Sequence, residues 1–100
     1  MKKILLVGSA GMSTSLLVTK MNNAAKEMGI EAEINALPVA ECSSKIDEVD
    51  IVLLGPQVRF QKPVVEKLAK GRIPVEVIDM RAYGLMDGKS ILKSAVEKIG

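Results

Sequence analysis

Residues 4 to 17, Ile-Leu-Leu-Val-Gly-Ser-Ala-Gly-Met-Ser-Thr-Ser-Leu-Leu, predict a strand that runs through a small-residue loop into a helix. The run Ile4 to Val7 is apolar throughout, which is typical of a strand buried on both faces of a parallel sheet. The hydroxyls of residues 13 to 15 suit the start of a helix. The loop Gly8 to Met12 places free backbone N–H groups at the positive end of that helix, which favours an anion site. The same layout also occurs in βα units that bind nothing.

Length and composition predict one domain, residues 1–100, with an aliphatic core. One hundred residues are enough for a single hydrophobic core. Nearly half of the residues are apolar, yet the only aromatic residues are Tyr83 and Phe60, so stacking platforms for nucleic acid are not expected. Basic and acidic residues are interspersed and give a net charge of +2, which indicates neither a nucleic-acid-binding nor a membrane-binding surface.

Other absences narrow the possible chemistry and location. No apolar stretch is long enough to span a bilayer, and the apolar run after Lys2 and Lys3 is too short for a signal peptide, so we expect a cytoplasmic protein without membrane insertion. One cysteine, Cys42, excludes an internal disulfide, and the chain has no histidine. We therefore expect no zinc site, no Ser/His or Cys/His dyad and no cofactor.

Three further strands and three further helices follow from the hydrophobic pattern. Residues 30–36 alternate as an edge strand does, 51–54 repeat the buried pattern, and 75–78 form a fourth strand. The first helix carries an apolar stripe and stops at Gly29; Pro63 lies in the first turn of another, and Asp87 caps the last. We predict a short helix within Val39 to Ile46 and a loop from Asp79 to Met86.

Strands that alternate with helices pair in parallel. The two most apolar strands belong in the middle, so the predicted fold is an α/β, flavodoxin-like three-layer sandwich whose four-stranded parallel sheet has the order 2-1-3-4, with helices on both faces. In that order the chain leaves strands one and three in opposite directions, which creates a crevice at their carboxyl ends. Gly8 to Ser15 and Gly55 to Gln57 should face each other there.

Two segments carry a resemblance to a known family, and it spans essentially the whole chain. They are Ser9-Ala10-Gly11-Met12-Ser13-Thr14-Ser15-Leu16-Leu17 and Leu53-Leu54-Gly55-Pro56-Gln57, with Tyr83-Gly84 beyond them. The sequence resembles the cytoplasmic IIB component of the lactose/cellobiose (oligo-β-glucoside and diacetylchitobiose) class of the bacterial sugar phosphotransferase system. The resemblance implies a phosphocarrier whose cysteine accepts phosphate from a IIA phosphohistidine and passes it to a β-glucoside-type disaccharide taken up through the membrane component IIC.

The resemblance also implies roles for individual residues. It makes position 8 the phosphoryl acceptor, and it makes the following segment the loop that binds a phosphate or sulfate anion: Ser9, Ala10, Gly11, Met12, Ser13, Thr14 and Ser15. Residues expected at the rim or in contact with the partner are Gly55, Pro56, Gln57, Val58 and Tyr83.

This sequence departs from the family pattern at the acceptor itself, because Gly8 stands where the family has its cysteine. Glycine carries no nucleophile, so the chain as written should be inactive in transfer. Either the cysteine was removed deliberately, or this is a natural paralogue that binds a partner or an anion without transferring phosphate.

Other residues are weaker candidates for the chemistry. Cys42 lies away from the expected crevice and is expected to fill core space. Ser9 has no base to activate its hydroxyl. Arg59 follows the Gly-Pro-Gln turn and is expected to be a solvated helix residue rather than an anion ligand. A phosphatase would want an arginine closing the first loop, and a flavin protein would want more aromatic residues.

Overall fold

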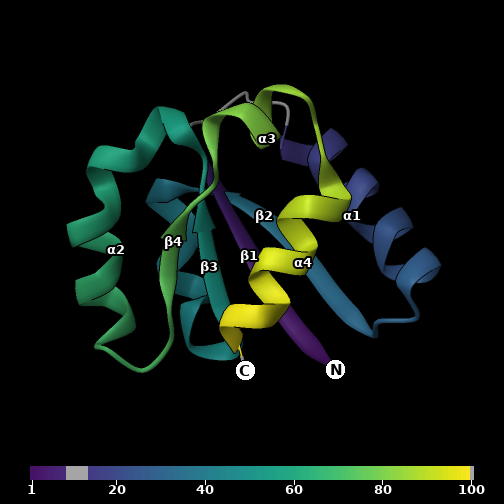
Figure 1. The fold of residues 1–100 in the computed structure, drawn as a ribbon. Helices are drawn as coiled ribbons and strands as arrows, with labels where there is room; N and C mark the ends of the chain where they lie inside the picture. The colour runs from purple at the N-terminus through teal and green to yellow at the C-terminus, as the bar shows by residue number, and fades with distance from the viewer. Residues whose placement is uncertain (9–13, 100) are drawn as a thin grey trace.

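A four-stranded parallel sheet lies at the centre of the computed structural model, which describes residues 1–8 and 14–99 (Figure 1). Its strands are β1 (Lys2–Gly8), β2 (Ala32–Pro38), β3 (Ile51–Leu54) and β4 (Val75–Val77). They pair in the order β2-β1-β3-β4, and every pairing is parallel. The predicted α/β fold with strand order 2-1-3-4 is confirmed.

The burial of the strands follows their hydrophobic pattern. Ile4 to Val7 in β1 and Ile51 to Leu54 in β3 are buried throughout, and Ile4 lies opposite Ile51 in the ladder. Along the edge strand β2, by contrast, Ile34 is buried while Glu33 and Asn35 on either side are exposed. A continuous apolar run therefore marks a central strand here, and alternation marks an edge.

Helices cover both faces of the sheet, as Figure 1 shows. One face carries α1 (Thr14–Met28) and α4 (Gly88–Ile99), and the other carries α2 (Lys62–Ala69) with the 3₁₀ helices η1 (Val39–Ser44) and η2 (Ile46–Glu48). Two more short helices, η3 (Pro56–Gln61) and α3 (Met80–Gly84), follow β3 and β4.

Successive residues of β1 feed two separate hydrophobic clusters. Leu6 packs with Met21 and Leu92 beneath α1 and α4, whereas Leu5 packs with Val65 beneath α2. Because neighbouring side chains of a strand point to opposite faces, one apolar run holds both helical layers. Removal of apolar surface from water stabilises a folded protein by about 25 cal/mol per Å². Because β1 buries apolar side chains on both of its faces, it is a major source of stability.

The predicted helix boundaries are confirmed at two places. Gly29 ends α1 with φ +68°, and the next amide, that of Ile30, donates to the Ala25 carbonyl at 2.9 Å. At the start of α4, the Ser90 amide donates to the Asp87 Oδ1 atom at 3.1 Å. A left-handed glycine and an aspartate cap therefore act as the sequence indicated.

Two helical segments differ from the prediction. The predicted loop Asp79 to Met86 contains α3, whose first turn is capped by Asp79, since the Ala82 amide donates to its Oδ2 atom at 3.0 Å. The 3₁₀ helix η3 also precedes α2, with a break in helical geometry at Val58. Elements of five or six residues are too short to display a hydrophobic period, which is why the pattern did not reveal them.

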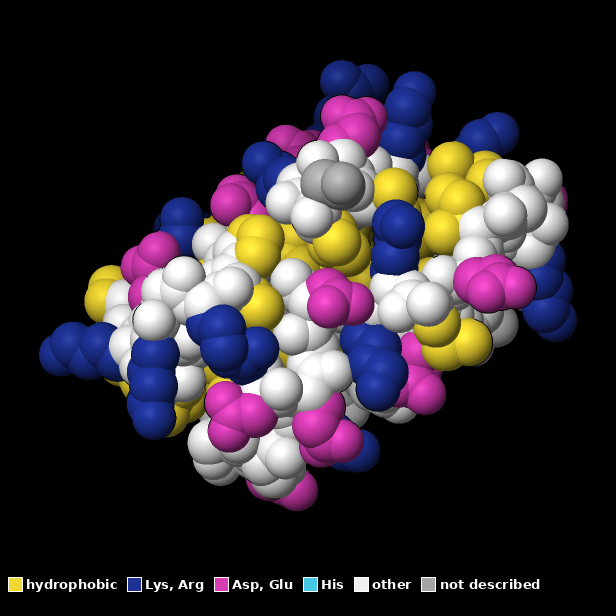
Figure 2. All heavy atoms as spheres, turned by 90° about the horizontal axis from the view of Figure 1, so that it is seen from below, with side chains coloured by type: hydrophobic (Ala, Val, Ile, Leu, Met, Phe, Trp, Pro, Cys, Tyr) yellow, Lys and Arg dark blue, Asp and Glu magenta, His cyan; other side chains and the backbone are white. Residues whose placement is uncertain are grey.

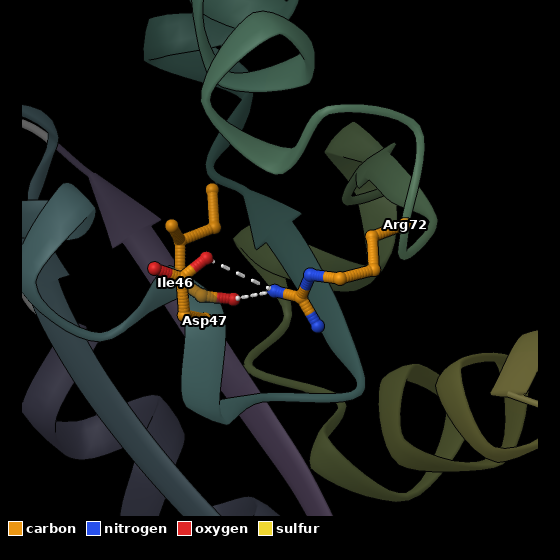
Figure 3. A network of polar contacts seen from close by, with 3 residues as sticks. All are labelled: Ile46, Asp47 and Arg72. Atoms are coloured by element: carbon orange, nitrogen blue, oxygen red, sulfur yellow. Dashed lines mark hydrogen bonds and ion pairs between the residues drawn. The ribbon is translucent and has the colours of Figure 1, made fainter.

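At the amino ends of the strands, polar contacts hold the connections together. The Arg72 Nη2 atom donates to the Ile46 carbonyl at 2.7 Å and lies 3.4 Å from the Asp47 Oδ1 atom (Figure 3). This contact joins the turn before β4 to η2. Seen from this end of the molecule, basic and acidic side chains are intermixed (Figure 2).

Gly88 should be required for the contact between α4 and α1. A Cβ atom at this position would lie 2.6 Å from the Lys20 carbonyl carbon and 2.8 Å from the Met21 nitrogen, both of them backbone atoms. We expect Gly88→Ala to lower the free energy of unfolding by about 1–3 kcal/mol, because two backbones must separate. Urea denaturation followed by circular dichroism measures the change.

Gly84→Ala is the matched control, since a Cβ there meets nothing within 4 Å. It should leave stability unchanged or slightly raise it, because alanine is the better helix former. Equal stabilities for the two variants would contradict the close packing described at Gly88.

Candidate functional site

The carboxyl ends of the two central strands form the centre of the candidate site. Gly8 is buried at the end of β1, and the Gly55 amide donates to the Val7 carbonyl at 2.8 Å, which extends the β1–β3 pairing beyond β3. Helix α1 begins at Thr14, shortly after β1 ends. The two glycines at the strand ends are thus placed side by side.

Side chains from two further elements close around Gly55. A Cβ atom at this glycine would lie 3.0 Å from the Gln57 Oε1 atom, 3.7 Å from the Val7 carbonyl oxygen and 3.8 Å from the Tyr83 Cε1 atom. Four segments therefore meet at one point: the end of β1, the end of β3, the start of η3, and the part of α3 that carries Tyr83. Of the residues predicted for the site, the structure brings Gly8, Gly55, Gln57 and Tyr83 together.

Most of the predicted anion loop lies outside the described residues. This holds for Ser9, Ala10, Gly11, Met12 and Ser13. Thr14 is the first residue of α1, and Ser15 follows it with an exposed side chain and a carbonyl that accepts from the Thr19 hydroxyl at 3.2 Å. The predicted role of this loop in binding an anion stays a prediction.

The predicted rim residues differ in exposure. Gln57 is exposed, but Val58 is 5% exposed and packs in the hydrophobic cluster beneath α2, so its side chain does not reach the surface as a rim contact would. Pro56 is also buried. Tyr83 is 7% exposed rather than a surface residue, and its hydroxyl is buried without a hydrogen-bond partner among the described residues.

A shallow hollow of about 270 Å³ lies beside this point, between η3 and α3. Its lining consists of Pro56, Gln57, Arg59, Met80, Tyr83 and Gly84. Arg59 is exposed, and its Nη1 atom turns back to donate to the Pro56 carbonyl at 3.4 Å. This agrees with the prediction of a solvated helix residue.

Sequence reasoning missed a set of exposed apolar side chains at this end of the molecule, which we call the apolar rim. Its members are Leu16, Phe60, Val64, Met80 and Leu85, each about half or more exposed. All of them lie in segments that follow the carboxyl ends of β1, β3 or β4. In the sequence they look like core residues, and only the three-dimensional arrangement shows that they face solvent. Because they come from all three connections around the carboxyl ends of these strands, they make that end of the domain a candidate interaction surface.

A second hollow of about 190 Å³ lies between β4 and α4. Its acidic groups already have partners: the Lys98 Nζ atom lies 3.6 Å from the Glu76 Oε1 atom, and Asp79 caps α3. With no unpaired buried side chain aimed into it among the described residues, this hollow is the weaker candidate.

Two other kinds of site receive no support. The described part of the chain gathers no cluster of three or more acidic, cysteine or histidine side chains that would hold a metal ion. Within residues 1–8 and 14–99, every helix is too short or too polar to traverse a bilayer.

Comparison with known proteins identifies the family. The chain matches the family model of the phosphotransferase (PTS) system, lactose/cellobiose-specific IIB subunit, over residues 3–94. This chain belongs to that family. It is 50% identical over 97 residues to the oligo-β-mannoside-specific EIIB component of Bacillus subtilis (strain 168), covering 96% of this chain and 94% of the relative. The sequence-based recognition of a IIB subunit is thereby confirmed.

Solved IIB structures share the fold. The cellobiose-specific IIB component from Borrelia burgdorferi superposes with a TM-score of 0.80 at 41% identity, covering 98% of this chain and 91% of that one. The lactose-specific IIB domain from Streptococcus pneumoniae gives a TM-score of 0.82, with 97% and 96% covered. Its identity is 19%, so that likeness shows the fold alone.

Cys42, the one thiol of this IIB chain, is buried in η1. Its side chain is 0% exposed and packs with the cluster beneath α2. Burial raises the pKa of the thiol, and a hydrogen bond with the backbone opposes this rise only in part. A buried, protonated thiol is a poor nucleophile, which agrees with the predicted structural role.

Cys42 should therefore resist alkylation while the protein is folded. Because the side chain is 0% exposed and burial also raises its pKa, we expect iodoacetamide to label Cys42 at least tenfold more slowly in buffer than in 8 M urea, where unfolding exposes the thiol and removes the cause of the rise. Mass spectrometry of timed samples measures both rates. Equal rates in the two solutions would contradict the burial of this thiol.

Proposed function

We propose that this chain is a IIB phosphocarrier domain, residues 1–100, in which position 8 is the phosphoryl-acceptor position and Gly8 makes this form inactive in transfer. The observation that carries the proposal is the position of Gly8, buried at the end of β1 beside Gly55 and close to the start of α1. Membership of the lactose/cellobiose-specific IIB family supports it. Cys42, buried in the cluster beneath α2, is not the acceptor in this proposal.

The chemistry follows from placing a thiol at position 8. A helix start lowers the pKa of a nearby cysteine, so thiolate would be available at neutral pH without a neighbouring base. The thiolate sulfur would attack the phosphorus of a phosphohistidine; an S–P bond would form as the P–N bond breaks, and the electron pair would return to the imidazole nitrogen. Backbone amides of residues 9–15 would hold the equatorial oxygens, which is the main requirement of phosphoryl transfer.

Two protein partners complete the proposed cycle. A IIA phosphohistidine protein would dock on the apolar rim and supply the phosphoryl group, and the membrane component IIC would deliver it to the sugar, with this domain on the cytoplasmic side. The sugar in the proposal is a β-glucoside-type disaccharide. Relatives of this chain are named for different sugars, oligo-β-mannoside and cellobiose, although they share its family. In this proposal, IIC therefore selects the sugar.

A second candidate function is a non-enzymatic one. Gly8 favours it directly, because a paralogue without the nucleophile keeps the fold and the apolar rim and would still dock IIA or an anion. The two candidates differ in one respect: whether a thiol restored at position 8 accepts phosphate.

Restoring the thiol should restore phosphorylation. We expect Gly8→Cys to gain the mass of one phosphoryl group when incubated with phosphorylated IIA, because the substitution supplies the missing thiol at the end of β1. The unaltered chain should gain none. Intact-protein mass spectrometry follows the reaction.

The matched control is Gly8→Cys combined with Cys42→Ser, which should be phosphorylated equally well. If labelling of Gly8→Cys required Cys42, or if the unaltered chain became labelled, position 8 would not be the acceptor. A folded Gly8→Cys protein that stays unlabelled would favour the non-enzymatic function.

Docking of IIA should involve the apolar rim and Gln57. In a titration of labelled protein with IIA, we expect the largest NMR shifts at Phe60, Met80 and Gln57. Phe60→Ser should weaken binding about tenfold, as the loss of an apolar anchor does. Glu33→Ser, on the exposed edge strand β2, is the control and should bind normally. Shifts confined to β2 would reject this docking surface.

A further inference from the structure

The Tyr83 hydroxyl group has a position that core packing alone does not explain. The residue is 7% exposed, and its oxygen is buried with no hydrogen-bond partner among the described residues. Buried hydroxyl groups in proteins normally have a partner, because an unsatisfied one costs the free energy of removing it from water. Phenylalanine would fill the same space without that cost.

The ring of Tyr83 is directed at the candidate site. Its Cε1 atom lies 3.8 Å from the point where a Cβ atom of Gly55 would be, and that point is 3.7 Å from the Val7 carbonyl oxygen. Cε1 is bonded to the carbon that carries the hydroxyl, so the polar end of the ring is the end beside the two strand termini. Asp79, which caps α3, fixes the helix that presents this ring.

Within residues 1–8 and 14–99, no group accepts a hydrogen bond from the Tyr83 hydroxyl. The Gln57 Oε1 atom lies 3.0 Å from the point where a Gly55 Cβ atom would be, on the same side of the site as the ring, yet it accepts no hydrogen bond from the tyrosine. A buried phenol without a described partner suits an anion, because a hydrogen bond to a charged acceptor is about twice as strong as one between neutral groups.

We propose that Tyr83 is an anion-binding residue of the site, and that its hydroxyl donates a hydrogen bond to an oxygen of the phosphoryl group or of a free phosphate ion at the end of β1. The inference rests on the proposed function, since it takes the anion to be phosphate. It adds a side-chain donor to a site in which the expected donors are main-chain amides, and it assigns Tyr83 a contact with the ligand rather than with a partner protein.

The sequence provides a direct readout. Tyr83 is the only tyrosine and the chain has no tryptophan, so tyrosine fluorescence reports on this one residue. Titration with inorganic phosphate should change the emission of the unaltered protein in a saturable manner. Chloride at matched ionic strength should not.

Tyr83→Phe separates binding from packing, because it removes only the oxygen. Phosphate affinity, followed by NMR shifts of the Gly55 and Gln57 amides, should fall about tenfold, as expected for loss of a hydrogen bond to a charged group. The melting temperature should stay equal or rise, because a buried unpaired group has been removed. Ser94→Ala, which removes an exposed hydroxyl from α4, is the matched control and should change neither quantity.

Two outcomes would overturn the proposal. If Tyr83→Phe bound phosphate as tightly as the unaltered protein, the hydroxyl would have no role, while the proposed function would stand. If the unaltered protein bound no phosphate and its fluorescence did not respond, the role of Tyr83 would also be rejected, and phosphorylation of Gly8→Cys would decide the proposed function independently.

Discussion

The parallel pairing of β1 with β3 is the interaction on which the rest of the structure depends. It joins two segments that are distant in the sequence, and it sets the register in which Ile4 lies opposite Ile51. Both strands are buried on both faces, so each supplies side chains to the two hydrophobic clusters. The helical layers are held in place by this pair, and so is the position of every segment that leaves its carboxyl end.

The same pairing creates the candidate site. Beyond β1 the chain passes to α1 on one face, and beyond β3 it passes to η3 and α2 on the other, so the two connections diverge. The hydrogen bond from the Gly55 amide to the Val7 carbonyl holds the strands together up to the point of divergence. In open α/β sheets, ligands usually bind in the crevice where the connections from two neighbouring strands diverge. Here α3 adds Tyr83 from a third connection.

The sequence predicted best those elements in which several successive residues share one hydrophobic pattern. The run Ile4 to Val7 and its repeat at Ile51 to Leu54 predicted the central strands, and alternation predicted the edge strand β2. Gly29 and Asp87 predicted helix boundaries because each acts through its own backbone or side-chain geometry.

The parts that could not be predicted depend on contacts between distant segments. Helix α3 spans five residues, too few for periodicity to appear. Val58 and Phe60 are both apolar residues of η3, yet one is buried and the other is 70% exposed. Which of them faces the core is set by the break in helical geometry at Val58 and by the packing of α2, neither of which is encoded locally.

The apolar rim has a consequence for how the free protein behaves in concentrated solution. Its exposed side chains lie at one end, and a net charge of +2 gives weak long-range repulsion between molecules. The opposite end carries charges of both signs, with hydrophobic side chains between them (Figure 2). We therefore expect the domain to associate reversibly through the rim at high concentration. A partner that covers the rim would also keep the domain in solution.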